Sequence, residues 1–330
     1  MNNNDTISFQ SVLDALTSTG KDLPRRYLQQ FSDIGTLELK TLLDVWPRVS
    51  TSRKVTLLEG LQSLAEEDTL VNFDDFARAI LNDPDPQVRI RAIRLLSECE
   101  DTKLASTFLD MLKSDKDVNV RVEAAHALGL FVDLGELEEI SESIYHKIED
   151  TLLAVANGDD DSRVRRAALE SLGYSARPEV ITLIESSFHR EDPAWQTSAI
   201  VAMGRSADDR WEENVLRSLV SVNDNIRRSA VEAAGNLEIK SARTVLLQLM
   251  NEEEDDSVMR AVIWSLSQIG GEDVRTYLEN LLDQIEDEDQ VAYLEEALDN
   301  LAFTEDLDRF DLFAFDPDAE LSDVEEDDEQ

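Results

Sequence analysis

The feature that most constrains this chain is a block of residues that recurs at a nearly constant spacing. Each copy begins with an apolar anchor, and further apolar residues follow four, five and eight positions later. The anchors stand 32, 44, 31, 31 and 32 residues apart, at Val88, Val120, Val164, Trp195, Ile226 and Val258. A period of about 20 to 50 residues with helical spacing inside each copy is typical of stacked helical hairpins, which bury their apolar faces against their neighbours. The sequence therefore predicts an all-α solenoid.

Residues that favour helix ends recur in step with this period. Three residues before each anchor stands an Asp or Asn, whose side chain can accept hydrogen bonds from the first backbone N–H groups of a helix. These residues are Asp85, Asp117, Asp161, Asp192, Asn223 and Asp255. Glycine follows four anchors, at Gly129, Gly173, Gly204 and Gly235. We expect these glycines to adopt the left-handed conformation that closes a helix, which makes each anchored segment the second helix of a pair.

Weaker copies flank the six clear ones. They comprise Leu57, Leu58 and Leu61 before the array and Tyr293, Ala297, Leu298 and Leu301 after it. We therefore expect about eight repeats, forming a right-handed α-solenoid over residues 50–304 behind a helical N-terminal cap over residues 1–49. The 44-residue step carries extra residues around Phe131. From these we expect that the helix before Val164 is long or is preceded by an extra turn, and that the insertion forms a local bulge in the stack.

Acidic residues dominate the charge of the chain, which is −41. Residues 305–330 contain 13 acids and one Arg, or −12, so the other 59 acids and 30 bases carry −29. Such a field repels phosphate backbones and attracts basic groups. We therefore expect a protein partner of basic or mixed charge, and neither nucleic acid nor a membrane. Repulsion without a buried face predicts that the segment 305–330 is a disordered acidic tail.

Three aromatic residues in this tail, Phe310, Phe313 and Phe315, leave two interpretations open. Acidic segments that alternate with apolar residues often bind partners, whereas Phe310 and Phe313 could instead fold back over the last helix pair. A third hypothesis is that the tail acts as a decoy for a nucleic-acid site on a partner. Deletion of residues 305–330 distinguishes the tail hypotheses.

The remaining composition indicates a cytoplasmic protein. No run approaches the roughly 18 apolar residues of a membrane span, and residues 1–5 lack the basic and apolar character of a leader. The single cysteine, Cys99, excludes a disulfide framework within one chain. We expect Cys99 to be an inert packing residue.

The motif Asp-x-x-Val-Arg-x-x-Ala-x-x-x-Leu-Gly, at residues 117–129 and 161–173, resembles the HEAT repeat, in particular the short bacterial type named after phycobilisome lyases. The resemblance implies an armadillo-type fold. It also implies a ladder in which the Asp before each anchor pairs with the Arg after an anchor in a neighbouring repeat. The matching residues are Asp85, Asp117, Asp161, Asp192 and Asp255, with Arg89, Arg121, Arg165 and Arg227. Gln196 and Met259 interrupt this pattern.

No catalytic constellation stands out in the sequence. The three histidines, His126, His146 and His189, share no spacing that would bind a metal, and we expect His126 to be a lone, partly buried side chain. We therefore expect a non-enzymatic protein-binding scaffold or adaptor with no cofactor. The alternative is an auxiliary subunit of an enzyme complex that is similar to the HEAT subunits of bilin lyases. That resemblance would imply a second HEAT chain and a tetrapyrrole.

Overall fold

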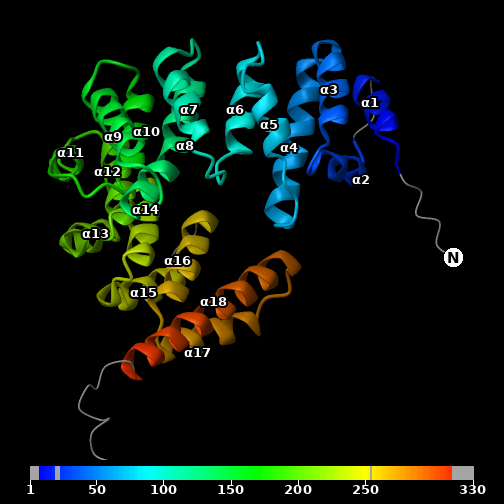
Figure 1. Cartoon of the computed structure of the whole chain (residues 1–330). Coiled ribbons are helices and arrows are strands. Elements are labelled where there is room, and N and C mark those ends of the chain that lie inside the picture. Colours follow the sequence, from blue (N-terminus) through cyan, green and yellow to red (C-terminus); the bar gives the residue numbers. More distant parts are fainter. Residues whose placement is uncertain (1–6, 19–22, 253–254, 314–330) are drawn as a thin grey trace, which may run out of the picture. The chain divides into compact units, whose positions relative to one another are not determined.

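The computed structural model describes residues 7–18, 23–252 and 255–313. Every regular element in these residues is a helix, which confirms the all-α prediction (Figure 1). The chain divides into two compact units, Met1–Leu183 and Ile184–Gln330. This boundary falls within α11 (Pro178–Phe188), inside the array that the sequence predicts as one solenoid. None of the described helices combines the length and the apolar character that a bilayer span requires.

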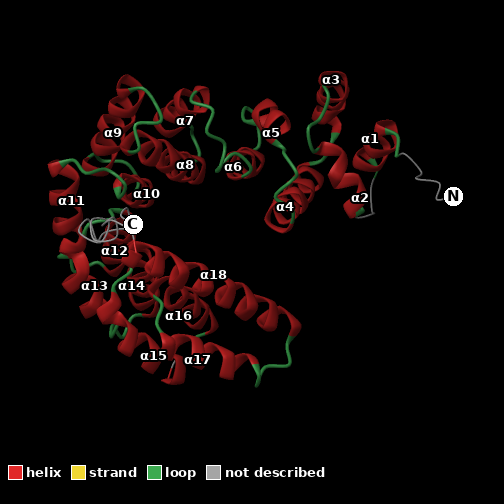
Figure 2. Cartoon of the chain, turned by 60° about the horizontal axis from the view of Figure 1, so that its bottom comes forward, coloured by secondary structure: helices red, strands yellow, loops and turns green. Residues whose placement is uncertain are grey.

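The first unit begins with α1 (Phe9–Thr17), α2 (Arg25–Leu28), η1 (Gln29–Phe31), α3 (Thr36–Val45) and η2 (Trp46–Arg48). The helical pairs follow as α4 (Thr51–Glu67), α5 (Asp74–Ile80), α6 (Pro86–Arg94), α7 (Lys103–Ser114), α8 (Val118–Glu136), α9 (Glu142–Asn157) and α10 (Ser162–Leu172). The second helices α4, α6, α8 and α10 pack against one another in one row. The first helices α5, α7 and α9 form a second row beside it, and each packs against the second helix that follows (Figure 2). The apolar anchors and their partners lie between these two rows, where Val88, Val120 and Val164 are fully buried.

The second unit repeats this arrangement. It contains α12 (Pro193–Arg205), η3 (Asp209–Trp211), α13 (Glu212–Ser218), α14 (Asp224–Asn236), η4 (Lys240–Ala242), α15 (Arg243–Glu252), α16 (Asp256–Ile269), α17 (Glu272–Leu282) and α18 (Glu288–Phe313). The second helices α12, α14, α16 and α18 pack in sequence, and α13, α15 and α17 each pack against the helix that follows. Each unit is thus a stack of helical hairpins, as the period predicts.

The six predicted helix caps are confirmed. The side chains of Asp85, Asp117, Asp161, Asp192, Asn223 and Asp255 each accept a hydrogen bond from a backbone N–H in the first turn of the helix that follows. The repeated acid therefore fixes where each second helix starts.

The predicted role of the repeat glycines is wrong. None of the four has a positive φ, and Gly129 lies inside α8. The left-handed residues that follow the second helices α8, α12 and α14 are Glu138, Ala207 and Glu238. The glycines instead permit close helix packing: a Cβ on Gly204 would lie 2.8 Å from the Ala233 Cα, inside van der Waals contact.

The extra residues of the long step lengthen both helices of one pair. α8 continues to Glu136, with Phe131 and Val132 fully buried, and α9 spans 16 residues. Of the two alternatives for the helix before Val164, the structure shows the long helix. At the other end, the backbone of α18 continues to Phe313, past the predicted tail boundary at residue 305. Residues 314–330 lie outside the described residues.

Candidate functional site

A ladder of charged rungs connects neighbouring repeats of the first unit, but its carboxylates are not the ones that the resemblance implied. Arg89 on α6 forms a bidentate ion pair with Asp115, with N–O distances of 2.7 and 2.8 Å. Arg121 on α8 pairs in the same way with Asp160, at 2.7 and 3.0 Å, and this lowers the pKa of Asp160. The capping residues Asp117 and Asp161 are occupied with backbone N–H groups. The pairing acids stand one or two residues before the caps.

The first rung is the most deeply buried and involves a residue that the motif did not identify. Lys54, on α4, donates to Asp83 at 2.7 Å, and their side chains are 7% and 1% exposed. Trp46 Nε1 donates to the same carboxylate at 2.7 Å. Burial alone would raise the pKa of Asp83, but the hydrogen bonds from Lys54, the Asp85 backbone and Trp46 lower it below its ordinary value.

In four repeats the residue after the anchor has a second task, which is to hold the loop that precedes its own helix. Arg89 donates to the carbonyl of Asp83, Arg121 to that of Asp115 and Arg227 to that of Ser221, each six residues earlier. Gln196 makes the same bond to the Arg190 carbonyl at 2.7 Å. Gln196 therefore lacks the charge of the arginine in the other repeats but forms the same hydrogen bond to the loop.

The other predicted ladder residues are placed as follows. Arg165 donates to the Ala156 carbonyl at 3.1 Å, and Arg227 pairs with Asp224 at 2.9 Å within its own helix. Asp192 and Asp255 cap their helices. Phe310 and Phe313 belong to the backbone of α18, while Phe315 lies outside the described residues.

The exposed face of α4, α6, α8 and α10 carries a second set of pairs across neighbouring helices. Arg91 pairs with Glu59, Arg94 with Glu123, and His126 with Glu170. His126 is thus an exposed, paired side chain, so the expectation of a lone, partly buried histidine is wrong. On this face of the first unit, Arg91 and Arg94 are thus already paired with carboxylates.

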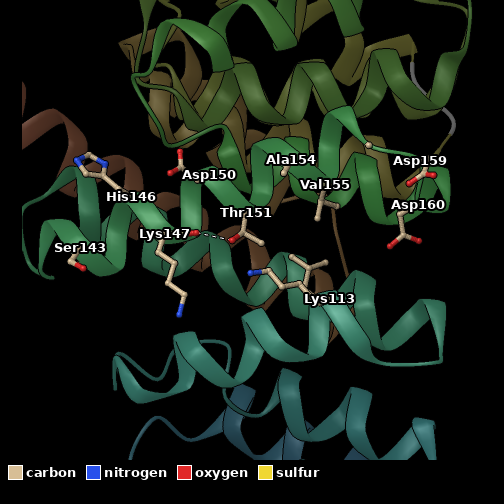
Figure 3. Close-up of a pocket in the computed structure, with 12 residues that line it drawn as sticks. Lys113, Ser143, His146, Lys147, Asp150, Thr151, Ala154, Val155, Asp159 and Asp160 are labelled. Atoms are coloured by element: carbon tan, nitrogen blue, oxygen red, sulfur yellow. Dashed lines mark hydrogen bonds between the residues drawn. The ribbon is translucent and has the colours of Figure 1, made fainter.

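A groove of about 800 Å³ runs between α7 and α9 on the opposite row of helices (Figure 3). Lys147 extends from α9 toward α7, and Lys113 extends from α7 into the same gap. Both are exposed, and neither forms an ion pair with any described residue. Asp159, also exposed, lines the far end and has no partner among the described residues. The groove therefore presents unpaired charges of both signs.

A buried polar network holds α9 in position behind this groove. The Glu149 carboxylate is fully buried and accepts from Ser175 Oγ at 2.6 Å, and His146 Nδ1 lies 2.9 Å from it. Tyr145 donates to Glu136, and burial together with these carboxylates raises the pKa of Tyr145. The Ser175 hydroxyl, in the segment that follows α10, donates to a carboxylate on α9, so this network ties the two together.

Two further features concern metal binding and thiol reactivity among the described residues. Across the described ranges, no three His, Cys, Asp or Glu side chains are grouped to hold a metal ion. Burial, followed by the nearby Asp74, raises the pKa of Cys99 and disfavours its reactive thiolate.

Comparison with known proteins identifies the repeat. The family model of HEAT repeats matches residues 75–144 and 213–299. No curated protein sequence matches the chain. Among solved structures, the complex of CpcE and CpcF of phycocyanin lyase from Nostoc sp. PCC7120 is similar, with a TM-score of 0.51, 19% identity, and coverage of 86% of this chain and 97% of that chain.

Two further solved structures show weaker similarity. YibA from E. coli has a TM-score of 0.41 and 18% identity, over 86% of this chain and 99% of its own. Kap121p bound to Pho4p has a TM-score of 0.43 and 14% identity, over 90% of this chain and 38% of its own. The repeat motif, the stacked hairpins and the family match agree that this chain contains HEAT repeats, at residues 75–144 and 213–299.

Proposed function

We propose that the chain is a non-enzymatic scaffold that binds a protein segment of mixed charge in the α7–α9 groove. The observation that carries this proposal is the pair of unpaired lysines, Lys113 and Lys147, that converge there. These two lysines line the same groove, where their positive charges contrast with the net charge of −41 of the chain. The two lysines favour an acidic group of the partner, and Asp159 favours a basic one.

The charge of the whole chain restricts the class of partner. A nucleic acid would have to bring its continuous phosphate backbone close to a protein with a net charge of −41. This repulsion opposes the binding that counterion release would otherwise drive. A protein segment can alternate acidic and basic residues to match the groove. We therefore favour a protein over a nucleic acid or a membrane surface.

The test is affinity capture from the native cell, followed by identification of any stoichiometric partner. Replacing Lys113 and Lys147 together by Glu should reduce recovery of that partner about tenfold or more, because each lost pair is replaced by repulsion. The matched control is Lys40→Glu with Lys103→Glu, which makes the same charge change at two exposed sites outside the groove. Equal recovery with both double variants would contradict the proposal.

A second candidate is an auxiliary role in an enzyme complex, and the fold shared with the CpcE–CpcF complex is its only support. This candidate predicts that the chain needs a second HEAT chain and contacts a tetrapyrrole. Mixing the protein with a bilin and recording visible absorption distinguishes the two. A new band that depends on the folded protein favours the second candidate.

A further inference from the structure

An apolar pocket of about 220 Å³ lies in the second unit, between α15, α16, α17 and α18. Its apolar lining consists of Met250, Met259, Ile263, Leu281, Ile285 and Leu294. It differs from the hollow around the Arg89–Asp115 rung of the first unit, which is lined largely by polar and charged side chains. The pocket is thus an apolar opening in a strongly charged molecule.

The pocket lies where the ladder is broken. Met259 follows its anchor, Val258, as Arg89 follows Val88. The loop between α17 and α18 contributes Ile285, whereas the loop between α7 and α8 contributes Asp115 to the rung of Arg89. Met259 therefore stands in the position of a rung arginine, and Ile285 comes from the loop that would supply the rung carboxylate, so apolar residues line a space that is left open here.

The rim of the pocket is ordered and polar. Tyr293 donates its hydroxyl proton to the Arg260 carbonyl at 2.9 Å, and the Arg260 guanidinium lies 5.9 Å from the centre of the Tyr293 ring. Asp256, in the first turn of α16, is exposed and has no partner among the described residues. The rim therefore has one unpaired carboxylate beside an apolar interior.

The volume and lining define the occupant. Pockets for drug-sized ligands measure about 300 to 1,000 Å³, so 220 Å³ suits one large side chain. Methionines adapt their shape and make favourable sulfur–aromatic contacts, and aromatic residues anchor many protein interfaces. We propose that this pocket binds an aromatic side chain of a protein partner, next to a basic residue that pairs with Asp256. The inference rests on the proposed function only in requiring a protein partner, since it does not involve the α7–α9 groove.

The methionines allow a direct test in the full chain. Of the five methionines, Met250 and Met259 line the pocket, while Met111 and Met203 lie elsewhere and serve as internal controls. The protein is labelled with [¹³C-methyl]methionine and titrated with the peptide acetyl-Gly-Lys-Trp-Lys-Gly-amide. We expect saturable shifts of the Met250 and Met259 methyl signals only, with an affinity near about 1 mM for so small a probe. The peptide with Ala in place of Trp should produce no comparable shift.

Variants separate binding from folding. Met259→Arg with Ile285→Asp restores the charged rung and should abolish the shift of Met250, while Met259→Leu keeps the pocket apolar and should retain binding. Ile285→Phe fills the space and gives the same loss without adding charge. Asp256→Asn should weaken the Lys-flanked peptide about threefold and leave a Gly-flanked peptide unchanged.

Two results would overturn the inference: equal shifts with the Trp and Ala peptides, or shifts that persist in Ile285→Phe. Circular dichroism of each variant confirms that it is folded. The groove experiment with Lys113 and Lys147 has its own readout, so failure of one site is distinguishable from failure of the other.

Discussion

Replacing Lys54 by Met should destabilise the first unit strongly, because the change leaves Asp83 charged and buried. The pair is almost fully excluded from solvent, with a donor–acceptor distance of 2.7 Å. Removing one partner of such a pair costs about 3 to 5 kcal/mol. Trp46 and the Asp85 backbone still donate to the carboxylate, so we expect a value near the lower limit, about 3 kcal/mol.

The double variant Lys54→Met with Asp83→Asn separates the charge from the packing. The amide introduced by Asp83→Asn would keep an oxygen that accepts from Trp46 and would carry no uncompensated charge, so the double variant should lose only about 1 kcal/mol. The free energy of unfolding is measured by urea titration. Unfolding is followed by far-UV circular dichroism and by tryptophan fluorescence, to which Trp46 beside the rung contributes. Arg94→Met is the control, since the exposed Arg94–Glu123 pair contributes about 0.2 to 1 kcal/mol.

The effect of pH gives an independent check. The folded protein lowers the pKa of Asp83, so the stabilisation by its ionised form is present above its unfolded pKa and is lost as pH falls through the folded pKa. The difference between wild type and Lys54→Met should therefore shrink on acidification. A loss below about 1 kcal/mol at neutral pH, or a difference that grows in acid, would refute the assignment of a buried ionic rung.

Three further predictions concern the repeat itself. Gly204→Ala should cost about 1 to 3 kcal/mol, because its new methyl group meets the Ala233 backbone at 2.8 Å, whereas Gly129→Ala, whose nearest contact is a side-chain oxygen at 3.2 Å, should cost less in the same urea titration. Gln196→Ala should lose about 0.5 to 1.5 kcal/mol with its loop hydrogen bond; no change in unfolding would exclude a role for that bond. Asp117→Ala should lose about 1 kcal/mol, and Asp117→Ser should recover most of it as an alternative cap.

Periodicity and caps were predictable from the sequence because they are local. An apolar residue at a helical spacing and an Asp three residues earlier act within one turn of one helix, so a single copy already contains the signal. Repetition then separates that signal from chance. The helices and their starting points followed from this information alone.

The partners in each rung and the role of the glycines were harder to predict from the sequence, because both depend on contacts with a neighbouring repeat. Asp115 stands two residues before the cap Asp117, and only the packed loops show which of the two faces Arg89. The sequence pattern did not identify Lys54, because the residue before it is Arg53, where the other copies have an apolar anchor. For Gly204, the sequence cannot tell a residue that needs a left-handed φ from one that needs space for the next helix.

The lysine groove has no local signal either. Lys113 and Lys147 belong to different repeats, and only the packing of α9 beside α7 brings them into one groove. The buried Glu149 network fixes α9, so one wall of this groove is held in place.

In the sequence, Met259 interrupts the predicted ladder of charged residues, and in the structure it lines an apolar pocket. Replacing a buried ion pair by apolar residues of similar size is often neutral or stabilising, so a repeat can lose its rung without weakening the stack. If stability alone had set the residues, however, Met259 and Ile285 would be expected to close on each other and leave no space. They instead line a pocket of about 220 Å³ beside an unpaired carboxylate, Asp256. An unfilled apolar space lowers stability in proportion to its volume, and binding a partner's side chain there would recover that loss.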